Sequence, residues 1–272
     1  MILGLASPSY TSQLPEQKPL LWLLERCSEH GLRALEASLP LDGRDDPEEI
    51  GKAAADLGIR WIGYWSEDFV TPEGGVSGLS GRAQKVLDVA RRGGVKSLVI
   101  FGRTDLHNRF TKEPPLEGQL KRMADHLGPV AEAASERDVQ LGLLPHLDYR
   151  GKELVSVMET VGHPHLRMAF DTANALPVCE DPVDAARSVL PHAIAVAFKD
   201  ARVYPGRSNQ VTIWGTPIGQ GSVDFEGILE MMAEELPDPD GTTVAIKLRL
   251  PHESQEHKVW MEESLEYLRS HL

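Results

Sequence analysis

The sequence predicts an α/β fold in which eight parallel strands close into a (β/α)8 barrel. Short apolar runs alternate with helical patterns along all 272 residues, without a linker or a shift in composition. Polar residues follow the ends of two successive apolar runs, Val139–Leu144 and Leu166–Phe170. Strict alternation implies parallel strands, and eight such units close most readily as a barrel. We therefore expect one domain over residues 1–272.

Each expected strand is a short apolar run bounded by turn residues. The runs are Ile2–Leu5, Leu32–Ser38, Ile59–Trp65, Val95–Phe101, Val139–Leu144, Leu166–Phe170, Ile194–Lys199 and Thr243–Leu250. Between Lys199 and Asp224 we expect a long loop. An open doubly wound sheet would need a glycine-rich phosphate loop after the first strand, and Ser7-Pro8-Ser9 has no such pattern. The closed barrel is therefore the better prediction.

The segments between the strands carry apolar residues at helical spacing. The expected helices are Pro19–His30, Pro47–Leu57, Leu79–Arg92, Pro115–Arg137, Lys152–Val161, one that begins at Pro182, Phe225–Glu235 and His257–Leu272. Asp46-Pro47 and Asp181-Pro182 each place a capping carboxylate before a proline at the first helical position. These two pairs fix the starts of their helices.

Composition excludes several classes of partner. The net charge is −13 and there is no basic cluster, which disfavours nucleic acid and anionic membranes. No apolar run approaches the roughly 20 residues of a membrane helix, and Met1–Tyr10 does not resemble a signal peptide. Cys27 and Cys179 have neither ligand spacing nor a disulfide framework. We expect a cytoplasmic chain, with a homo-oligomer left open.

Candidate catalytic residues lie where the expected strands end. Asp171 and Asn174 follow one strand, and His146 follows another beside a proline. In the last strand, Lys247 shares a face with Thr243 and Ala245, whereas the opposite face is uniformly apolar. We therefore expect Lys247 to point into the barrel, at the same mouth as Asp171 and His146. Inside, it is either a reactive amine or the partner of Asp171 or Glu36.

Further candidates would contact a ligand rather than react with it. Glu36 is an acid inside an apolar strand, for which we expect a cationic partner such as Lys247 or Arg249, because an unpaired buried carboxylate is costly. Lys199 would orient a substrate or form a structural ion pair with Asp200. The remaining candidates would stack on a sugar ring or bind a phosphate or sugar acid. They are Trp65, Trp214 and Tyr64 for stacking, and His107, Asn108, Arg109, Arg202 and Arg207 for the anion, with core packing or solvated loops as the alternatives.

Three motifs carry a resemblance to a known family. They are DTANAL after the sixth strand, FKDARV at the seventh, and TPIGQGSVDFEGIL before a helix. In this order they resemble the xylose-isomerase-like TIM barrels, which are sugar-phosphate isomerases and epimerases and also include endonuclease IV. The resemblance implies a divalent metal such as manganese, held by Glu, Asp, His and Glu at the ends of strands five to eight. Carboxylates would then move a proton between adjacent carbons.

Three of the four implied ligand positions are replaced in this chain. Leu144, Ala197 and Lys247 stand where the resemblance implies Glu, His and Glu, and only Asp171 remains. Leucine and alanine cannot coordinate a metal, and a lysine brings a positive charge to the place of the cation. We therefore expect no tightly bound divalent ion and no other cofactor.

Three functions remain open at this stage. The first is a sugar isomerase or epimerase that binds a small carbonyl or sugar-like ligand at the mouth without the usual metal site. The second is a metal-free lyase of the aldolase type in which Lys247 forms a Schiff base, since apolar surroundings favour the neutral, nucleophilic amine of a lysine. The third is a carbohydrate-binding barrel without catalysis. DNA repair of the endonuclease IV kind would need metal-binding histidines and a basic groove, and neither is visible.

Overall fold

Eight parallel strands close into a barrel, as the alternating pattern predicts. A computed structural model of the chain describes residues 1–206, 210–249 and 257–271. The strands are β1 (Ile2–Ala6), β2 (Ala34–Ser38), β3 (Arg60–Ser66), β4 (Ser97–Phe101), β5 (Gln140–Leu143), β6 (Leu166–Asp171), β7 (Ala193–Phe198) and β10 (Thr243–Ile246). Their order around the closed barrel is β1-β10-β7-β6-β5-β4-β3-β2. All carboxyl ends therefore meet at one mouth.

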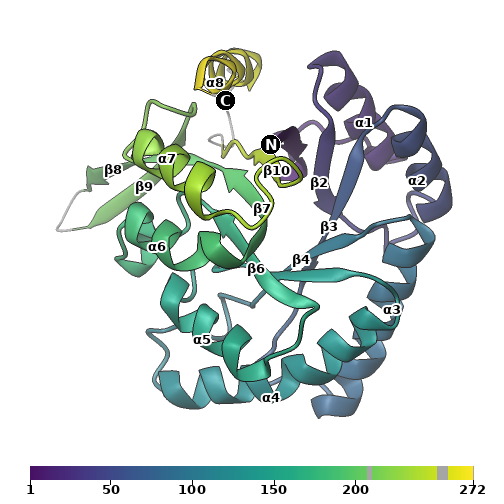
Figure 1. The fold of residues 1–272 in the computed structure, drawn as a ribbon, viewed down its shortest axis with the longest axis vertical. Helices are drawn as coiled ribbons and strands as arrows, with labels where there is room; N and C mark the ends of the chain where they lie inside the picture. Colours follow the sequence, from purple (N-terminus) through teal and green to yellow (C-terminus); the bar gives the residue numbers. More distant parts are fainter. Residues whose placement is uncertain (207–209, 250–256, 272) are drawn as a thin grey trace.

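Eight helices in the described residues surround the strands (Figure 1). They are α1 (Pro19–Glu29), α2 (Pro47–Asp56), α3 (Gly75–Arg92), α4 (Leu116–Ser135), α5 (Gly151–Val161), α6 (Pro182–Val189), α7 (Phe225–Glu235) and α8 (His257–His271). The expected caps are confirmed, because Asp46 accepts hydrogen bonds at the start of α2 and Asp181 at the start of α6. Helix α3 begins four residues earlier than its apolar pattern predicts. Its first turn is rich in glycine. Glycine has no side chain, so these residues do not contribute to the apolar pattern from which the helix was predicted.

The apolar core has an outer and an inner layer. The outer layer packs the strands against the helices and includes Val244, Ile246 and Leu248 of the last strand segment. The inner layer is smaller and fills the barrel. It consists of Ala34, Ile62, Tyr64, Val99, Leu144, Ala169 and Ala195, with Ile2 and Phe101 packed against it. The predicted alternation in the last strand is confirmed, since its apolar side faces the helices and the buried Lys247 lies on the other side.

One expectation of the sequence is wrong in the stretch after β7. A two-stranded antiparallel hairpin, β8 (Asp200–Pro205) and β9 (Val211–Thr216), replaces the long loop expected between Lys199 and Asp224. The hairpin projects from the barrel beside α6 and α7 (Figure 1). Its strands contain β-branched and aromatic residues, but they lie outside the regular βα alternation on which the prediction rested.

Two expected element ends lie outside the described residues, namely Leu250 and Leu272. None of the helices in the described ranges is both long and apolar enough to cross a membrane.

Candidate functional site

A buried carboxylate with two lysines occupies the mouth of the barrel. Asp171, the last residue of β6, lies with Oδ1 3.0 Å from Nζ of Lys199 and with Oδ2 3.3 Å from Nζ of Lys247. The exposed fractions of these side chains are 0%, 9% and 4%. Closure of the barrel brings them together, because β6 neighbours β7 and β7 neighbours β10. The prediction that Lys247 points into the barrel is thus confirmed, and among the alternatives left open for it the structure shows the pairing with Asp171.

Hydrogen bonds from the exit loops hold this cluster in place. The side-chain oxygen of Asn174 accepts a hydrogen bond from Lys199, and its Nδ2 donates to the carbonyl of Pro145 at 2.9 Å. The hydroxyl of Thr172 donates to the carbonyl of Lys199 at 2.6 Å and accepts from its N–H at 2.9 Å. Asn174 therefore links the loop after β5 to the lysine after β7, which fits its expected place in the site.

A second acidic group, Glu36 on β2, lies near Lys247 and Asp171. The hydroxyl of the buried Tyr64 donates a hydrogen bond to Oε1 of the buried Glu36. Nζ of Lys247 is 5.2 Å from the centre of the Tyr64 ring, within the range of a cation–π contact. Within the described residues, Glu36 forms no ion pair, so the expected cationic partner is replaced by a phenol. Strand alternation could have found Tyr64, which points inward together with Ile62.

Burial and charge shift four pKa values at the mouth. Burial raises the pKa of Glu36 to about 7, although Lys247 opposes the shift. Burial also acts to raise the pKa of Asp171, but the attraction of Lys199 and Lys247 outweighs it and lowers the value to about 2. Burial lowers the pKa of Lys199 to about 8 and that of His146 to about 4. At neutral pH, Asp171 is thus ionised, His146 is neutral, and Glu36 is present in both its protonated and its ionised form.

Aromatic rings line one side of the mouth. His146 packs on Phe101 with ring centroids 4.4 Å apart, and Phe101 meets Tyr64 edge to face at 6.0 Å. Phe101 and His146 are half-buried, so part of each ring is accessible. The backbone N–H of His146 donates to Oδ1 of Asp148 at 2.8 Å, which fixes the loop. This wall is able to stack on a flat or ring-shaped ligand.

Residues at the remaining implied ligand positions are apolar. Leu144 is buried in the inner layer, and Ala197 lies opposite Asp171 in the β6–β7 register. Across the described part of the chain, no group of three or more His, Cys, Asp or Glu side chains is arranged to hold a metal ion.

The structure separates three predicted ligand contacts from this cluster. Trp65 lies in the outer layer and meets Phe69 edge to face at 5.5 Å. Trp214 and Arg202 face each other across the β8–β9 hairpin, where 49% of Trp214 is exposed and Arg202 donates to the carbonyl of Gln220 at 2.5 Å. The alternation of β3 turns Trp65 toward the helices, and the hairpin carries the other two away from the barrel axis.

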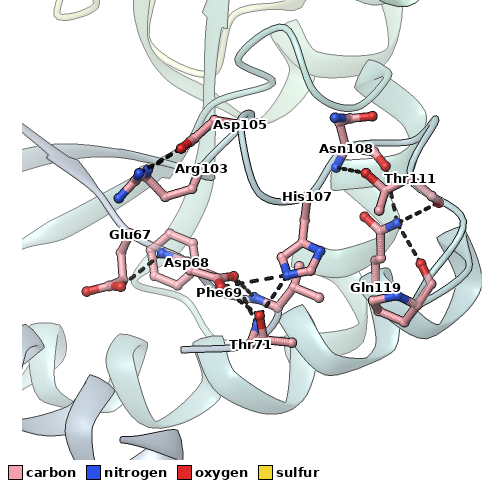
Figure 2. Close-up of polar contacts among 12 residues, drawn as sticks. Glu67, Asp68, Phe69, Thr71, Arg103, Asp105, His107, Asn108, Thr111 and Gln119 are labelled. Carbon is pink, nitrogen blue, oxygen red and sulfur yellow. Dashed lines mark hydrogen bonds and ion pairs between the residues drawn. The ribbon is translucent and has the colours of Figure 1, made fainter. Parts of the chain in front are cut away.

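Two arginines of the loop after β4 are already paired with carboxylates. Arg103 forms a bidentate pair with Asp105, with distances of 2.9 and 2.7 Å, and Arg109 pairs with Glu153 at 3.1 Å. Figure 2 shows the Arg103 pair, and it also shows His107 turned toward the loop after β3. Arg207, the other candidate for this role, lies outside the described residues. Arg103 and Arg109 are committed to carboxylates, so the solvated-loop alternative fits these two better.

His107 and its neighbours form a separate polar network. The imidazole Nε2 of His107 is 2.7 Å from the hydroxyl of Thr71, which donates to Asp68 at 2.8 Å. On the other side of the loop, Gln119 donates to the carbonyls of Asn108 and Thr111 at 3.2 and 3.3 Å (Figure 2). The network ties the exit loops of β3 and β4 together, which is a structural role.

Comparison with known proteins places this barrel in a family. Residues 24–271 match the family described as "Xylose isomerase-like TIM barrel". The chain belongs to this family. Its eight-stranded parallel barrel and the order of its three motifs agree with that membership.

One curated protein and several solved structures are also similar to this chain. An uncharacterized protein of Escherichia coli K12, YihM, is 28% identical over 123 residues, which are 43% of this chain and about a third (36%) of that protein. The IOLI protein, solved with a zinc atom, has a TM-score of 0.76 at 13% identity and covers 99% of this chain and 97% of its own. D-psicose 3-epimerase from Clostridium cellulolyticum H10, solved with D-tagatose, has a TM-score of 0.75 at 16% identity. The match covers 99% of this chain and 98% of that protein. At these identities, the two structures share the fold.

Proposed function

We propose that this family member binds a small carbonyl compound of the sugar type at the mouth and shifts a proton between neighbouring carbons without a divalent metal. The observation that carries the proposal is the placement of two lysines on one buried carboxylate, with Glu36 beside them. The fold relationship to sugar epimerases supports this class of ligand.

The residues at the mouth do not fit the metal of the family. Leu144 and Ala197 offer no donor atom, and both oxygens of Asp171 already face ammonium groups. The ammonium of Lys247 would repel a divalent ion bound to the same carboxylate. The lysines instead supply a built-in positive charge in the place where the family uses a metal.

A proton transfer follows from this arrangement. The Glu36 carboxylate removes a proton from the carbon next to the substrate carbonyl, and the C–H electron pair moves to form the enolate. The ammonium groups of Lys199 and Lys247 stabilise the enolate oxygen, because aligned charge in a buried site favours developing negative charge. Glu36 then returns the proton to the former carbonyl carbon, and the proton of the neighbouring hydroxyl passes to the enolate oxygen, so that the carbonyl moves by one carbon as in an isomerase. A pKa of about 7 suits a base that works near neutral pH.

Solvent exchange tests the proposal directly. The chain, treated with EDTA, is incubated in D2O with D-tagatose, D-fructose, L-ribulose and hydroxypyruvate, and deuterium next to the carbonyl is measured by NMR. We expect exchange that persists without metal and falls at least 100-fold in Glu36→Gln, in line with the loss of a general base. Glu132→Gln, an exposed residue on α4, is the matched control. Binding without exchange would favour the non-catalytic carbohydrate-binding barrel.

One observation favours the Schiff-base lyase as a second candidate, although at a different lysine. Asp171 contacts both lysines, at 3.0 Å from Lys199 and 3.3 Å from Lys247, yet burial still lowers the pKa of Lys199 to about 8. Borohydride in the presence of a ketone ligand would then trap a covalent adduct at Lys199. Labelling at Lys247 would restore the original assignment, and scattered labelling of surface lysines would leave this candidate without support.

A further inference from the structure

The described residues at the mouth of the barrel carry more positive than negative charge. Nζ of Lys199 lies 3.0 Å and Nζ of Lys247 lies 3.3 Å from the same carboxylate, that of Asp171. The three side chains are almost fully buried, and one ionised carboxylate offsets only one of the two ammonium groups. A buried charge without a counter-charge is costly, so this excess calls for an anion.

Glu36 offsets the excess only in part. Its Oε1 accepts a hydrogen bond from the hydroxyl of Tyr64, and burial raises its pKa to about 7. Near neutral pH, Glu36 is therefore ionised in only part of the molecules. In the proposed reaction the same group takes up a proton from the substrate, which removes its negative charge. A lasting counter-charge for the lysines therefore has to come from another group.

Lys247 has hydrogen-bond donors that no described residue uses. An ammonium has three N–H donors. Nζ of Lys199 donates to Oδ1 of Asn174 and contacts Oδ1 of Asp171. Within the described ranges, Nζ of Lys247 makes no hydrogen bond, since Oδ2 of Asp171 is 3.3 Å away but remains without a hydrogen-bond partner. Nζ also faces the ring of Tyr64, whose centre is 5.2 Å away. Lys247 is thus a buried cation with unused donors, which suits an anionic acceptor.

We infer that the substrate is a sugar acid, a small carbonyl compound whose own carboxylate pairs with Lys247. This inference rests on the proposed function, because it takes the mouth as the substrate site. A carboxylate carries one negative charge, which matches the excess, and both of its oxygens accept hydrogen bonds. A neutral sugar would leave the excess in place. A phosphate ester, with a charge of about −1.5 to −2 at neutral pH, would exceed it.

The other walls of the mouth suit the uncharged part of such a ligand. Leu144 is buried in the inner layer and Ala197 lies opposite Asp171, so neither offers an acceptor that competes for Lys247. Their apolar side chains also keep the local dielectric constant low, which strengthens the attraction between a lysine and a carboxylate. The rings of Phe101 and His146 are half-buried, and a short carbon chain is able to lie against them.

Calorimetric titration of the native chain with matched ligands tests this substrate class. Hydroxypyruvate differs from dihydroxyacetone only by a carboxylate in place of a hydroxymethyl group, and 2-keto-D-gluconate differs from D-fructose in the same way. We expect each acid to bind at least about 10-fold more tightly than its neutral partner at pH 7, because a hydrogen bond to a charged group adds to affinity. D-fructose 1-phosphate, which carries a phosphate at the same end of the ketose, should bind more weakly than 2-keto-D-gluconate.

Substitutions of Lys247 assign the preference to one side chain. Lys247→Met should lower the affinity for 2-keto-D-gluconate to that for D-fructose, because Asp171 keeps Lys199 as its partner and the excess charge is gone. Lys247→Arg keeps the charge and should restore much of the preference. Lys96→Met, at an exposed ion pair before β4 and thus at the opposite end of the barrel, is the matched control and should bind as the native chain does. Circular dichroism checks that each variant is folded.

The sequence contains two further acids, Glu253 and Glu256, outside the described residues. If one of them supplied the counter-charge, the acids would bind no better than their neutral partners, and Glu253→Gln combined with Glu256→Gln would create the preference. That result overturns the inference, as does the absence of binding by both acids at millimolar concentration. Tighter binding of D-fructose 1-phosphate than of 2-keto-D-gluconate overturns it too, in favour of a phosphate.

These outcomes are separate from those of the deuterium exchange experiment. Preferred binding of the acids without exchange next to the carbonyl would contradict the proposed reaction and leave the ligand class standing. Exchange in D-fructose, bound as tightly as 2-keto-D-gluconate, would support the reaction and overturn the sugar-acid inference.

Discussion

At the scale of single residues, the main feature of the mouth is the Asp171 carboxylate, which forms ion pairs with two lysines. Asp171 accepts both ammonium groups, and Lys199 is held in addition by Asn174. Buried charges persist only when they are paired, and removing one partner of such a pair costs about 3–5 kcal/mol. The cluster is therefore both a stability requirement and the source of positive charge for a ligand.

Asp148, another buried acid, leads to a prediction about how stability depends on pH. Its Oδ1 accepts hydrogen bonds from the backbone of His146 and Tyr149, whereas Oδ2 is buried without a partner in the described residues. A Cβ atom on Gly102 would lie only 2.8 Å from Oδ2, so this oxygen is pressed against the backbone. Burial raises the pKa of Asp148 from 3.8 to about 7.

The sign of the effect follows from proton binding. The folded chain keeps the Asp148 proton up to about pH 7, whereas the unfolded chain releases it near 3.8, so stability falls as the pH rises between these values. Asp148→Asn keeps the Oδ1 acceptor and cannot ionise. We expect its stability relative to native to rise by a few kcal/mol between about pH 4 and pH 8, since one pKa unit corresponds to about 1.4 kcal/mol.

Urea unfolding near pH 5 and near pH 8 measures most of this change. Asp184→Asn, at an exposed ion pair with Arg187, is the control and should show no such trend. Glu36 also has a raised pKa, but it contributes equally to native and variant and cancels in the difference. An equal stability difference at both pH values would contradict the assignment.

At the scale of elements, the start of a helix depends on a capping residue that can be recognised in the sequence. Oδ1 of Asp46 accepts from the N–H groups of Glu48 and Glu49 at 2.8 and 3.2 Å, which satisfies two donors at the start of α2. Asp46→Ala should destabilise the chain by about 1 kcal/mol. Asp46→Asn keeps the acceptor and should lose much less. Chemical denaturation measures both, and equal losses would mean that Asp46 acts through its charge on Arg92.

The hairpin shows the limit of element prediction. Its residues have strand propensity, yet a pattern of alternating strands and helices has no place for an extra ribbon between β7 and α7. Strand propensity alone does not say whether a segment finds a pairing partner. The partner here is the next segment of the same loop, which is settled only when the chain folds.

At the scale of the whole molecule, metal binding depends on residues from separate strands. We expect the native chain, purified ordinarily, to hold clearly less than one divalent ion per chain by elemental analysis. Leu144→Glu, Ala197→His and Lys247→Glu together should create binding of manganese or cobalt, detectable by calorimetry. Lys247→Met alone removes the charge without adding a ligand, and it should not bind. Stoichiometric metal in the native chain would argue for the metal-dependent reaction of the family.

The sequence by itself determined the features that repeat locally. Apolar periods gave the eight strands and the surrounding helices, Asp-Pro pairs gave two helix starts, and alternation placed Lys247 inside the barrel. Each of these depends on residues a few positions apart, because backbone geometry sets the period of two or of 3.6 residues. The same alternation, applied to β3, would have turned Trp65 outward and Tyr64 inward.

Only the tertiary structure decided which polar groups meet. Asp171 and Lys247 are far apart in the chain and come from β6 and the end of β10, which flank β7. Glu36 and Tyr64 come from the neighbouring strands β2 and β3, so each pair forms only when the strands of the barrel come into register. Glu36 meets a phenol, and one carboxylate meets two lysines, because these groups lie close together and are buried inside the barrel. Periodicity places a side chain on a face, but closure of the barrel selects its partner, since that selection depends on contacts between residues distant in sequence.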